Sequence, residues 1–196
     1  MASYPAIAAT SEAILGLLEA AAADTEFSGR RFALYNATDL QTPMKNGVSL
    51  WLYRVAVATT RRNLGPRTGD DGRRYRPSLP LDLHYLLTAW AQDPATQQRL
   101  LGWCIRTLED QPVLPSGLLN HYGPEPDVFR PHESVELVAE ALSPADVSDV
   151  WEVSPKHREP SMAYLARAVE IDSQVELAEF PAVQTREFAY AEESQA

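Results

Sequence analysis

Cysteine is almost absent from this sequence, since Cys104 is the only one in the chain. No intrachain disulfide can form, so nothing in the sequence favours an oxidising compartment. An uncharged apolar run of the ~20 residues that a bilayer span needs is also missing. The apolar N-terminus has no basic start and is interrupted by Glu12 and Glu19, which argues against a signal peptide. We therefore expect assembly in the cytoplasm and no membrane insertion.

Catalytic motifs are missing as well. The sequence contains no nucleotide-binding glycine loop, no HExxH, no paired Cys-x-x-Cys and no GxSxG. Its four histidines lie far apart, so we predict no cofactor and no metal site. Basic residues are scarce too, with 17 Lys and Arg against 27 Asp and Glu and a net charge of −10. Phosphate backbones and anionic membranes repel such a chain, so nucleic acid is not an expected partner.

What remains is the composition of a folded protein with one core. Hydrophobic residues make up 45% and charged residues 22% of the 196 residues, and a single core commonly holds about 100–200 residues. We predict one domain over residues 1–172, followed by an extended arm over residues 173–196.

Three stretches have helical patterns. Residues 5–24 carry an apolar stripe with a period of 3.6, and Ser3 is a candidate cap. A second helix is expected to begin after Asp93, with Pro94 in its first position, and a third after Ser143 in a capping-box pattern. The stripe of the first helix consists of Ile7, Ile14, Leu15, Leu18 and Ala22.

Five stretches alternate as strands do: Phe32–Tyr35, Val48–Ala58, Leu81–Ala91, Val135–Ala141 and Met162–Ile171. The second is apolar on both faces, which predicts a central strand covered on both sides. In this pattern one face carries Trp51, Tyr53, Val55 and Val57, and the other carries Val48, Leu50 and Leu52. Strands and helices together predict an α/β (α+β) fold in which helices pack on a mixed sheet.

Two stretches, 59–78 and 111–131, are rich in glycine or proline and are predicted to be irregular. The first holds six of the 17 basic residues. Such a loop can be solvated, dock on an acidic protein surface or bind phosphate, with phosphate the least favoured given the net charge. Its arginines are Arg61, Arg62, Arg67, Arg73, Arg74 and Arg76.

One pair of residues offers an enzymatic alternative. Asp82 and His84 are two positions apart in a predicted strand and would share a face, where a carboxylate and an imidazole can serve acid–base chemistry. No nucleophile or oxyanion element accompanies them, so a polar sheet face at an interface is favoured. A small hydrolase or metal-dependent enzyme, and a cargo or membrane adaptor, remain as alternatives to a structural role.

The arm carries the short apolar series Val175, Leu177 and Phe180 between glutamates. That pattern fits a strand with one buried and one solvated face, added to the edge of a partner sheet. Pro181 would limit such pairing to an edge. A frayed terminus is the alternative. The predicted interface residues are Arg61, Arg62, Asn63, Arg73, Arg74 and Arg76 of the loop, with Val175, Leu177 and Phe180 of the arm.

Several segments together resemble a known family. They are IAATSEAILGLLEA, VSLWLYRVAVATTRRNL, ALSPADVSDVWEV followed by SMAYLARAVEI, and, most specifically, LPLDLHYLLTAWAQDPATQQRLLGWCIRTLEDQPVL. Their order and spacing over residues 7–172 resemble the tail-terminator, or cap, proteins of extracellular contractile injection systems of the antifeeding-prophage type. No single short motif carries the resemblance alone.

The resemblance implies a structural protein without catalytic residues. It implies a fold like that of phage tail terminators and a six-fold ring of identical subunits on the last layer of an inner tube and its sheath. The expected partners are therefore further copies of the chain, the tube protein and the sheath protein. The particle could be released or retained in the cell. Some relatives carry a further C-terminal domain, whereas only a short arm follows Ile171 here.

Overall fold

The computed structural model describes residues 4–59, 64–69 and 71–178. Its main feature is a six-stranded mixed sheet with the strand order β1-β2-β5-β8-β7-β6, in which β1 and β2 are parallel and all other neighbours antiparallel. This confirms the predicted α+β class. The strands of the sheet are β1 Arg31–Tyr35, β2 Gly47–Val57, β5 Leu79–Trp90, β6 Val113–Pro115, β7 Ser134–Glu140 and β8 Ser161–Ile171. The helices are α1 Ala6–Ala22, α2 Pro94–Asp110, α3 Ser116–Tyr122 and α4 Pro144–Trp151, with the 3-10 turns η1 Asp39–Gln41 and η3 Pro155–His157.

The helix predictions are confirmed in their essentials. Four of the five predicted stripe residues of α1 are buried, and Ile7 is partly buried. Asp93 caps α2 by accepting a hydrogen bond from the Thr96 amide at 2.7 Å. At α4, Ser143 and Asp146 form the reciprocal capping box. Ser3 lies outside the described residues, and α1 begins at Pro5 without a side-chain cap.

Two apolar clusters occupy the two faces of the sheet, because alternate residues of each strand point to opposite sides. The inner face packs against α1, α2 and α3 in a large core that includes Tyr85, Leu87 and the fully buried Cys104. The outer face carries a smaller cluster in which Trp151 of α4 packs over Leu86, Trp90 and Leu40. The outer layer covers only one end of the sheet.

A buried hydrogen bond and a close approach fix α1 in the inner layer. Ser11 Oγ lies 2.8 Å from the Tyr85 hydroxyl of β5, and burial raises the pKa of that phenol. Gly16 leaves room for the ring of Tyr122, since a side chain at position 16 would collide with it. α1 is thereby held against both the sheet and α3.

The prediction that Val48–Ala58 is covered on both sides is wrong for its second half. A β-bulge between Leu52 and Arg54 reverses the alternation, so Val55 and Val57 pair with the inner-face residues Leu83 and Leu81 rather than sharing the face of Trp51. They lie at an end of the sheet where the inner layer does not cover them, and they are 46% and 43% exposed.

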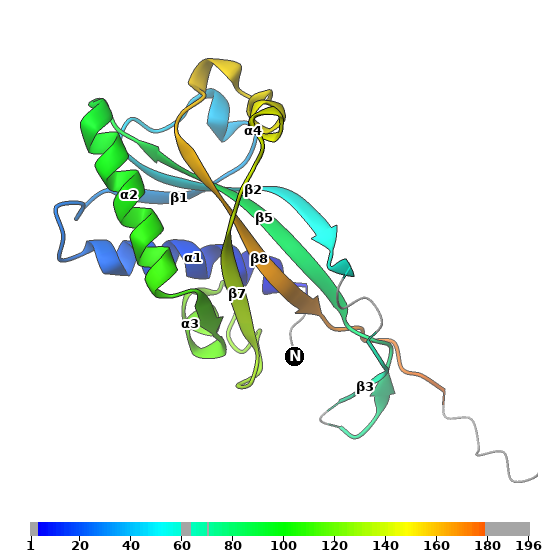
Figure 1. The fold of residues 1–196 in the computed structure, drawn as a ribbon. Coiled ribbons are helices and arrows are strands. Elements are labelled where there is room, and N and C mark those ends of the chain that lie inside the picture. The colour runs from blue at the N-terminus through cyan, green and yellow to red at the C-terminus, as the bar shows by residue number, and fades with distance from the viewer. Residues whose placement is uncertain (1–3, 60–63, 70, 179–196) are drawn as a thin grey trace, which may run out of the picture.

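Both stretches predicted to be irregular contain regular structure. Residues 111–131 include β6 and α3, and residues 59–78 include a two-stranded hairpin, β3 Arg67–Thr68 and β4 Arg74–Tyr75. In the hairpin, the glycines serve the turn instead of preventing structure, because Gly72 adopts a φ of 76° that other residues rarely tolerate. Figure 1 shows the hairpin projecting beyond the ends of β5 and β8.

Candidate assembly interface

The hairpin is joined by a third extended segment, which comes from the predicted arm. The Arg76 amide donates to the Val175 carbonyl at 3.0 Å, and the Leu177 amide donates to the Arg74 carbonyl at 2.8 Å. Tyr75 and Glu176 form the antiparallel bridge between these bonds. Residues 172–177 and the hairpin, which we call the arginine hairpin unit, therefore form one structure. The prediction that the arm leaves the domain from residue 173 is wrong for this part.

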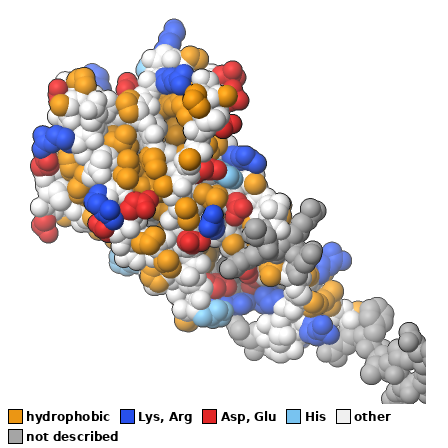
Figure 2. Space-filling model, in the orientation of Figure 1, with side chains coloured by type: hydrophobic (Ala, Val, Ile, Leu, Met, Phe, Trp, Pro, Cys, Tyr) orange, Lys and Arg blue, Asp and Glu red, His pale blue; other side chains and the backbone are white. Residues whose placement is uncertain are grey.

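Charge complementarity supports the pairing. Arg73 Nη1 donates to Glu176 Oε1 at 2.6 Å, and this hydrogen bond raises the pKa of the guanidinium. Both side chains are exposed, so solvent screens the pair and leaves its attraction weak. Arg74 and Arg76 are also exposed. Figure 2 shows basic side chains where the hairpin projects, against a body that presents both charge signs and a central band of hydrophobic side chains.

A buried carboxylate attaches the arginine hairpin unit to the domain. Asp172 is only 4% exposed and receives a hydrogen bond from Ser78 Oγ at 2.6 Å. Its Oδ2 lies 2.9 Å from Arg130 Nη2 and 3.4 Å from Arg67 Nε. The Arg67 guanidinium also lies over the Tyr75 ring, 4.8 Å from its centroid, and donates to the Ser173 carbonyl at 3.2 Å. The Asp172 side chain therefore joins β3, the end of β8 and the loop before β7.

A cavity of about 510 Å³ lies beside this carboxylate. Arg67, Arg130 and Asp172 line it together with His132 and Glu133. Among the described residues, the Nε and Nη1 atoms of Arg67 and the Nε atom of Arg130 are buried without a hydrogen-bond acceptor. Removing Asp172 would therefore be costly, because its carboxylate compensates the charge of both guanidinium groups.

Asp82 and His84 do not form the pair that the sequence suggested. His84 Nδ1 lies 2.9 Å from Glu140 Oε2, and Asp82 Oδ1 accepts from the Ala168 amide at 3.1 Å. Ala168 has a positive φ of 53° beside a bulge in β8, so Asp82 stabilises an unusual backbone conformation there. The imidazole has a carboxylate partner, but it comes from β7 and could not be found from spacing along one strand.

The His84–Glu140 contact includes a third group. The Tyr53 hydroxyl donates to Glu140 Oε2 at 3.3 Å, and burial, followed by the charge of Glu140, raises the pKa of this phenol to about 12. The three side chains connect β2, β5 and β7 across the outer face. They are arranged as a polar contact between strands of the same domain.

We expect the double change Asp82→Asn with His84→Gln to affect stability or assembly and to abolish no turnover. Each substitution keeps a polar side chain of similar size but removes the carboxylate charge or the imidazole. Purified variant and parent should be compared in a panel of hydrolase assays and by thermal unfolding. A turnover activity that the parent has and the double variant lacks would refute the structural role.

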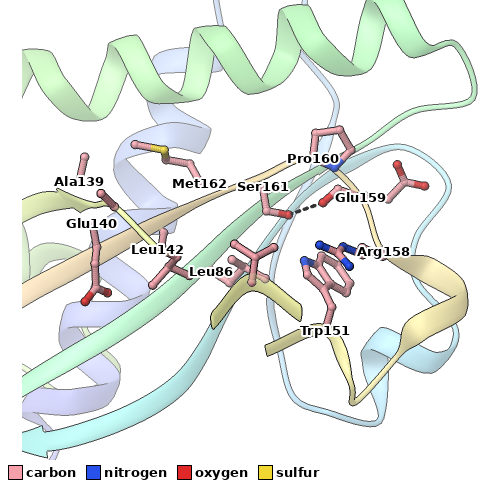
Figure 3. A pocket seen from close by; sticks show the side chains of 13 residues that line it. Leu86, Ala139, Glu140, Leu142, Trp151, Arg158, Glu159, Pro160, Ser161 and Met162 are labelled. Atoms are coloured by element: carbon pink, nitrogen blue, oxygen red, sulfur yellow. Dashed lines mark hydrogen bonds between the residues drawn. The ribbon is translucent and has the colours of Figure 1, made fainter. Parts of the chain in front are cut away.

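A second cavity, of about 700 Å³, lies on the outer face between α4 and the start of β8 (Figure 3). Trp151, Leu86 and Met162 contribute apolar surface, and Arg158 lies beside the Trp151 ring. Ser161 Oγ donates to the Glu159 carbonyl at 2.9 Å and holds the chain at this edge. Glu140 and Glu159 also line this cavity.

The structure brings together part of the predicted interface. Arg73, Arg74, Arg76, Val175 and Leu177 lie in the arginine hairpin unit. Arg61, Arg62, Asn63 and Phe180 lie outside the described residues. Sequence reasoning missed the anchoring role of Asp172 and Arg130, which are 42 positions apart.

Within residues 4–59, 64–69 and 71–178, no three His, Cys, Asp or Glu side chains are grouped so as to hold a metal ion. In the same ranges, every helix is too short or too polar to cross a membrane.

The mixed sheet, its inner helical layer and its projecting hairpin define an α+β domain. The fold is similar to a solved structure described as the sheath/tube terminator, in the extended state, of the extracellular contractile injection system PVC, with a TM-score of 0.59 and 16% identity. The match covers 95% of this chain and 65% of that one, so the chain spans less than two thirds of that terminator. The tube-terminating cap of the anti-feeding prophage also matches, with a TM-score of 0.49, 14% identity and coverage of 81% and 54%.

The family itself is shown by sequence. The profile of the Pvc16 N-terminal domain matches residues 9–185, which is most of the chain, and the chain belongs to this family. The match continues past residue 172 into the segment that pairs with the hairpin. No curated protein sequence matches the chain. The predicted relationship to terminators of contractile injection systems is confirmed.

Proposed function

We propose that this chain ends the inner tube and sheath of a contractile injection particle by forming a ring, six-fold by expectation, on their last layer. The observation that carries the proposal is the family match over residues 9–185, joined to a fold that resembles a sheath/tube terminator. The proposed role is structural and needs no catalytic residue. Electron microscopy of particles made with and without this protein tests it directly.

The proposed partners are further copies of the chain, the tube protein and the sheath protein. Assembly would take place in the cytoplasm, and the finished particle is either released or retained there. Nucleic acid is not a proposed partner, since a chain of net charge −10 is repelled by phosphate backbones. Membrane insertion is not part of the proposal.

The arginine hairpin unit is the proposed docking element. It projects from the sheet and carries exposed cations in an otherwise acidic chain. Copies with a net charge of −10 that pack in a ring repel one another, and a basic projection that meets an acidic neighbour offsets this repulsion locally. Arg73, Arg74 and Arg76 would face a neighbouring subunit or the tube.

Changing Arg73, Arg74 and Arg76 together to Ser should weaken association with tubes about tenfold at low salt, and less as salt rises. Exposed pairs contribute about 0–1 kcal/mol each, so a measurable loss needs several substitutions. The measurement is binding of the purified chain to tubes from cells that lack it, at increasing ionic strength.

The matched control for this triple change is Arg99, Arg106 and Arg167 to Ser, which removes the same charge from other exposed positions. The control should bind as the parent does. Equal binding by both triple variants at every salt concentration would reject the hairpin as the docking element.

A further inference from the structure

Half of strand β2 is an open sheet edge. β1 pairs with β2 only as far as Tyr35 opposite Trp51, and in the described part of the chain no strand pairs with Leu52–Val57 on the side away from β5. The open stretch is six residues long, or about 20 Å. An unpaired edge of this kind is a ready acceptor for another strand.

Exposed apolar side chains lie along the same stretch. Val55 and Val57 are 46% and 43% exposed on the inner face, and Leu79, which is 48% exposed, lies on that face two positions before Leu81, the partner of Val57. A strand that paired with this edge would cover the valines as well as satisfy backbone groups. The unpaired edge and the exposed apolar side chains therefore fit the same kind of partner, an extended segment with apolar side chains.

The sequence of this chain contains such a segment outside the described residues. Residues 182–190, AVQTREFAY, follow Pro181 and are rich in the β-branched and aromatic residues that favour strands. The two charged residues of the segment, Arg186 and Glu187, cancel each other, and the only charged residue in the open edge is Arg54. The apolar pattern of the segment therefore matches an edge that carries little charge.

The path of the chain favours an edge on another copy. From β8 to Ala178 the chain runs away from the sheet, beside the hairpin (Figure 1). Residues 179–181 link Ala178 to the segment and span about 14 Å when extended, so the segment begins where the chain has already left its own sheet. We infer that residues 182–190 of one copy add as a strand to the Leu52–Val57 edge of a neighbouring copy.

Crosslinking between two variants, each with one introduced cysteine, tests this inference. Full-length chains with Val55→Cys and with Phe188→Cys, which differ in tag length, are co-expressed and treated with a short bismaleimide. Cys104 does not compete, since it is fully buried and burial raises the pKa of its thiol to about 12. We expect a mixed dimer, because the two positions come together only between copies.

Two exposed positions on the other open edges are matched controls. Val113→Cys on β6 is 45% exposed and Leu34→Cys on β1 is 39% exposed. Each should give about tenfold less mixed dimer with Phe188→Cys than Val55→Cys does, because only the β2 edge holds the segment at high effective concentration. Equal yields, or a preference for Leu34→Cys, would overturn the assignment to β2.

A change outside the described residues separates strand pairing from chance contact. Thr185→Pro or Arg186→Pro on the Phe188→Cys chain should remove most of the mixed dimer, since one of two adjacent amides faces the paired edge and proline cannot donate, while Thr185→Ala and Arg186→Ala should retain it. No effect of either proline would contradict the inference.

The inference rests on self-assembly, which is part of the proposed function, and native mass measurement of the same samples separates the two. A ring that forms without the mixed dimer overturns the strand exchange and leaves the ring intact. A chain that neither crosslinks nor associates overturns both. A further chain carries both Val55→Cys and Phe188→Cys. If it crosslinks only within itself and the separate chains give no mixed dimer, the segment folds back on its own edge and the exchange between copies is overturned.

Discussion

Cells that lack this gene should produce tubes and sheaths of uncontrolled length, or few intact particles. Each layer of a tube built from identical subunits presents the next layer with the same surface, so head-to-tail growth has no internal stop. A terminator can stop growth because one of its faces matches the last layer and the other does not. The measurement is the distribution of particle lengths by electron microscopy in the deletion strain.

Complementation provides the control for the deletion. The parent gene should restore a narrow length distribution, and the variant with Arg73, Arg74 and Arg76 changed to Ser should restore it less well. Particles of normal length and yield without the gene would show that another component ends the tube, and the proposed function would then be wrong.

Asp172→Ala should lower the free energy of unfolding by about 3 kcal/mol, because it leaves two largely buried guanidinium groups without their shared carboxylate. Arg67 and Arg130 are 11% and 18% exposed, so water screens them only in part. For a chain of this length the loss corresponds to a fall in Tm of roughly 6–12 °C. Denaturant and thermal unfolding of the purified variant would measure it.

Glu136→Ala is the matched control, since Glu136 pairs with Arg167 at 3.6 Å but both side chains are more than half exposed. It should cost about 0–1 kcal/mol. Trypsin gives a local readout: cleavage after Arg73 and Arg74 should become faster in Asp172→Ala and stay unchanged in Glu136→Ala. Similar stability of the two variants would show that the buried Asp172 carboxylate does not hold the arginine hairpin unit.

Local patterns predicted the fold well where the signal lies within one element. The stripe of α1, the Asp93 cap and the strand over Leu81–Ala91 all depend on neighbouring residues, and the structure contains each of them. The reversal of Val55 and Val57 was missed because a bulge shifts the alternation by one residue and leaves no mark in composition.

The candidate site was predictable only in part, because its contacts join residues that are far apart in the sequence. Arginine density indicated that residues 59–78 could dock on a partner, but not that they form a hairpin. The contacts that shape the hairpin connect distant positions, as Ser78 and Arg130 both contact Asp172. His84 likewise finds Glu140, 56 positions away, and not the nearby Asp82. Pairings of this kind depend on the order of the strands in the sheet, and local patterns along the sequence do not reveal that order.

The unequal size of the two apolar clusters has a consequence for local opening. The layer formed by α4 and η3 is held mainly through Trp151 and its few buried contacts, whereas α1, α2 and α3 share one large core. Segments with few buried contacts open at lower free energy than the molecule as a whole. We expect amide protons of residues 144–157 to exchange with solvent well before those of α1 or β5. The outer face of the sheet would then become accessible in a population of molecules whose inner core is still folded.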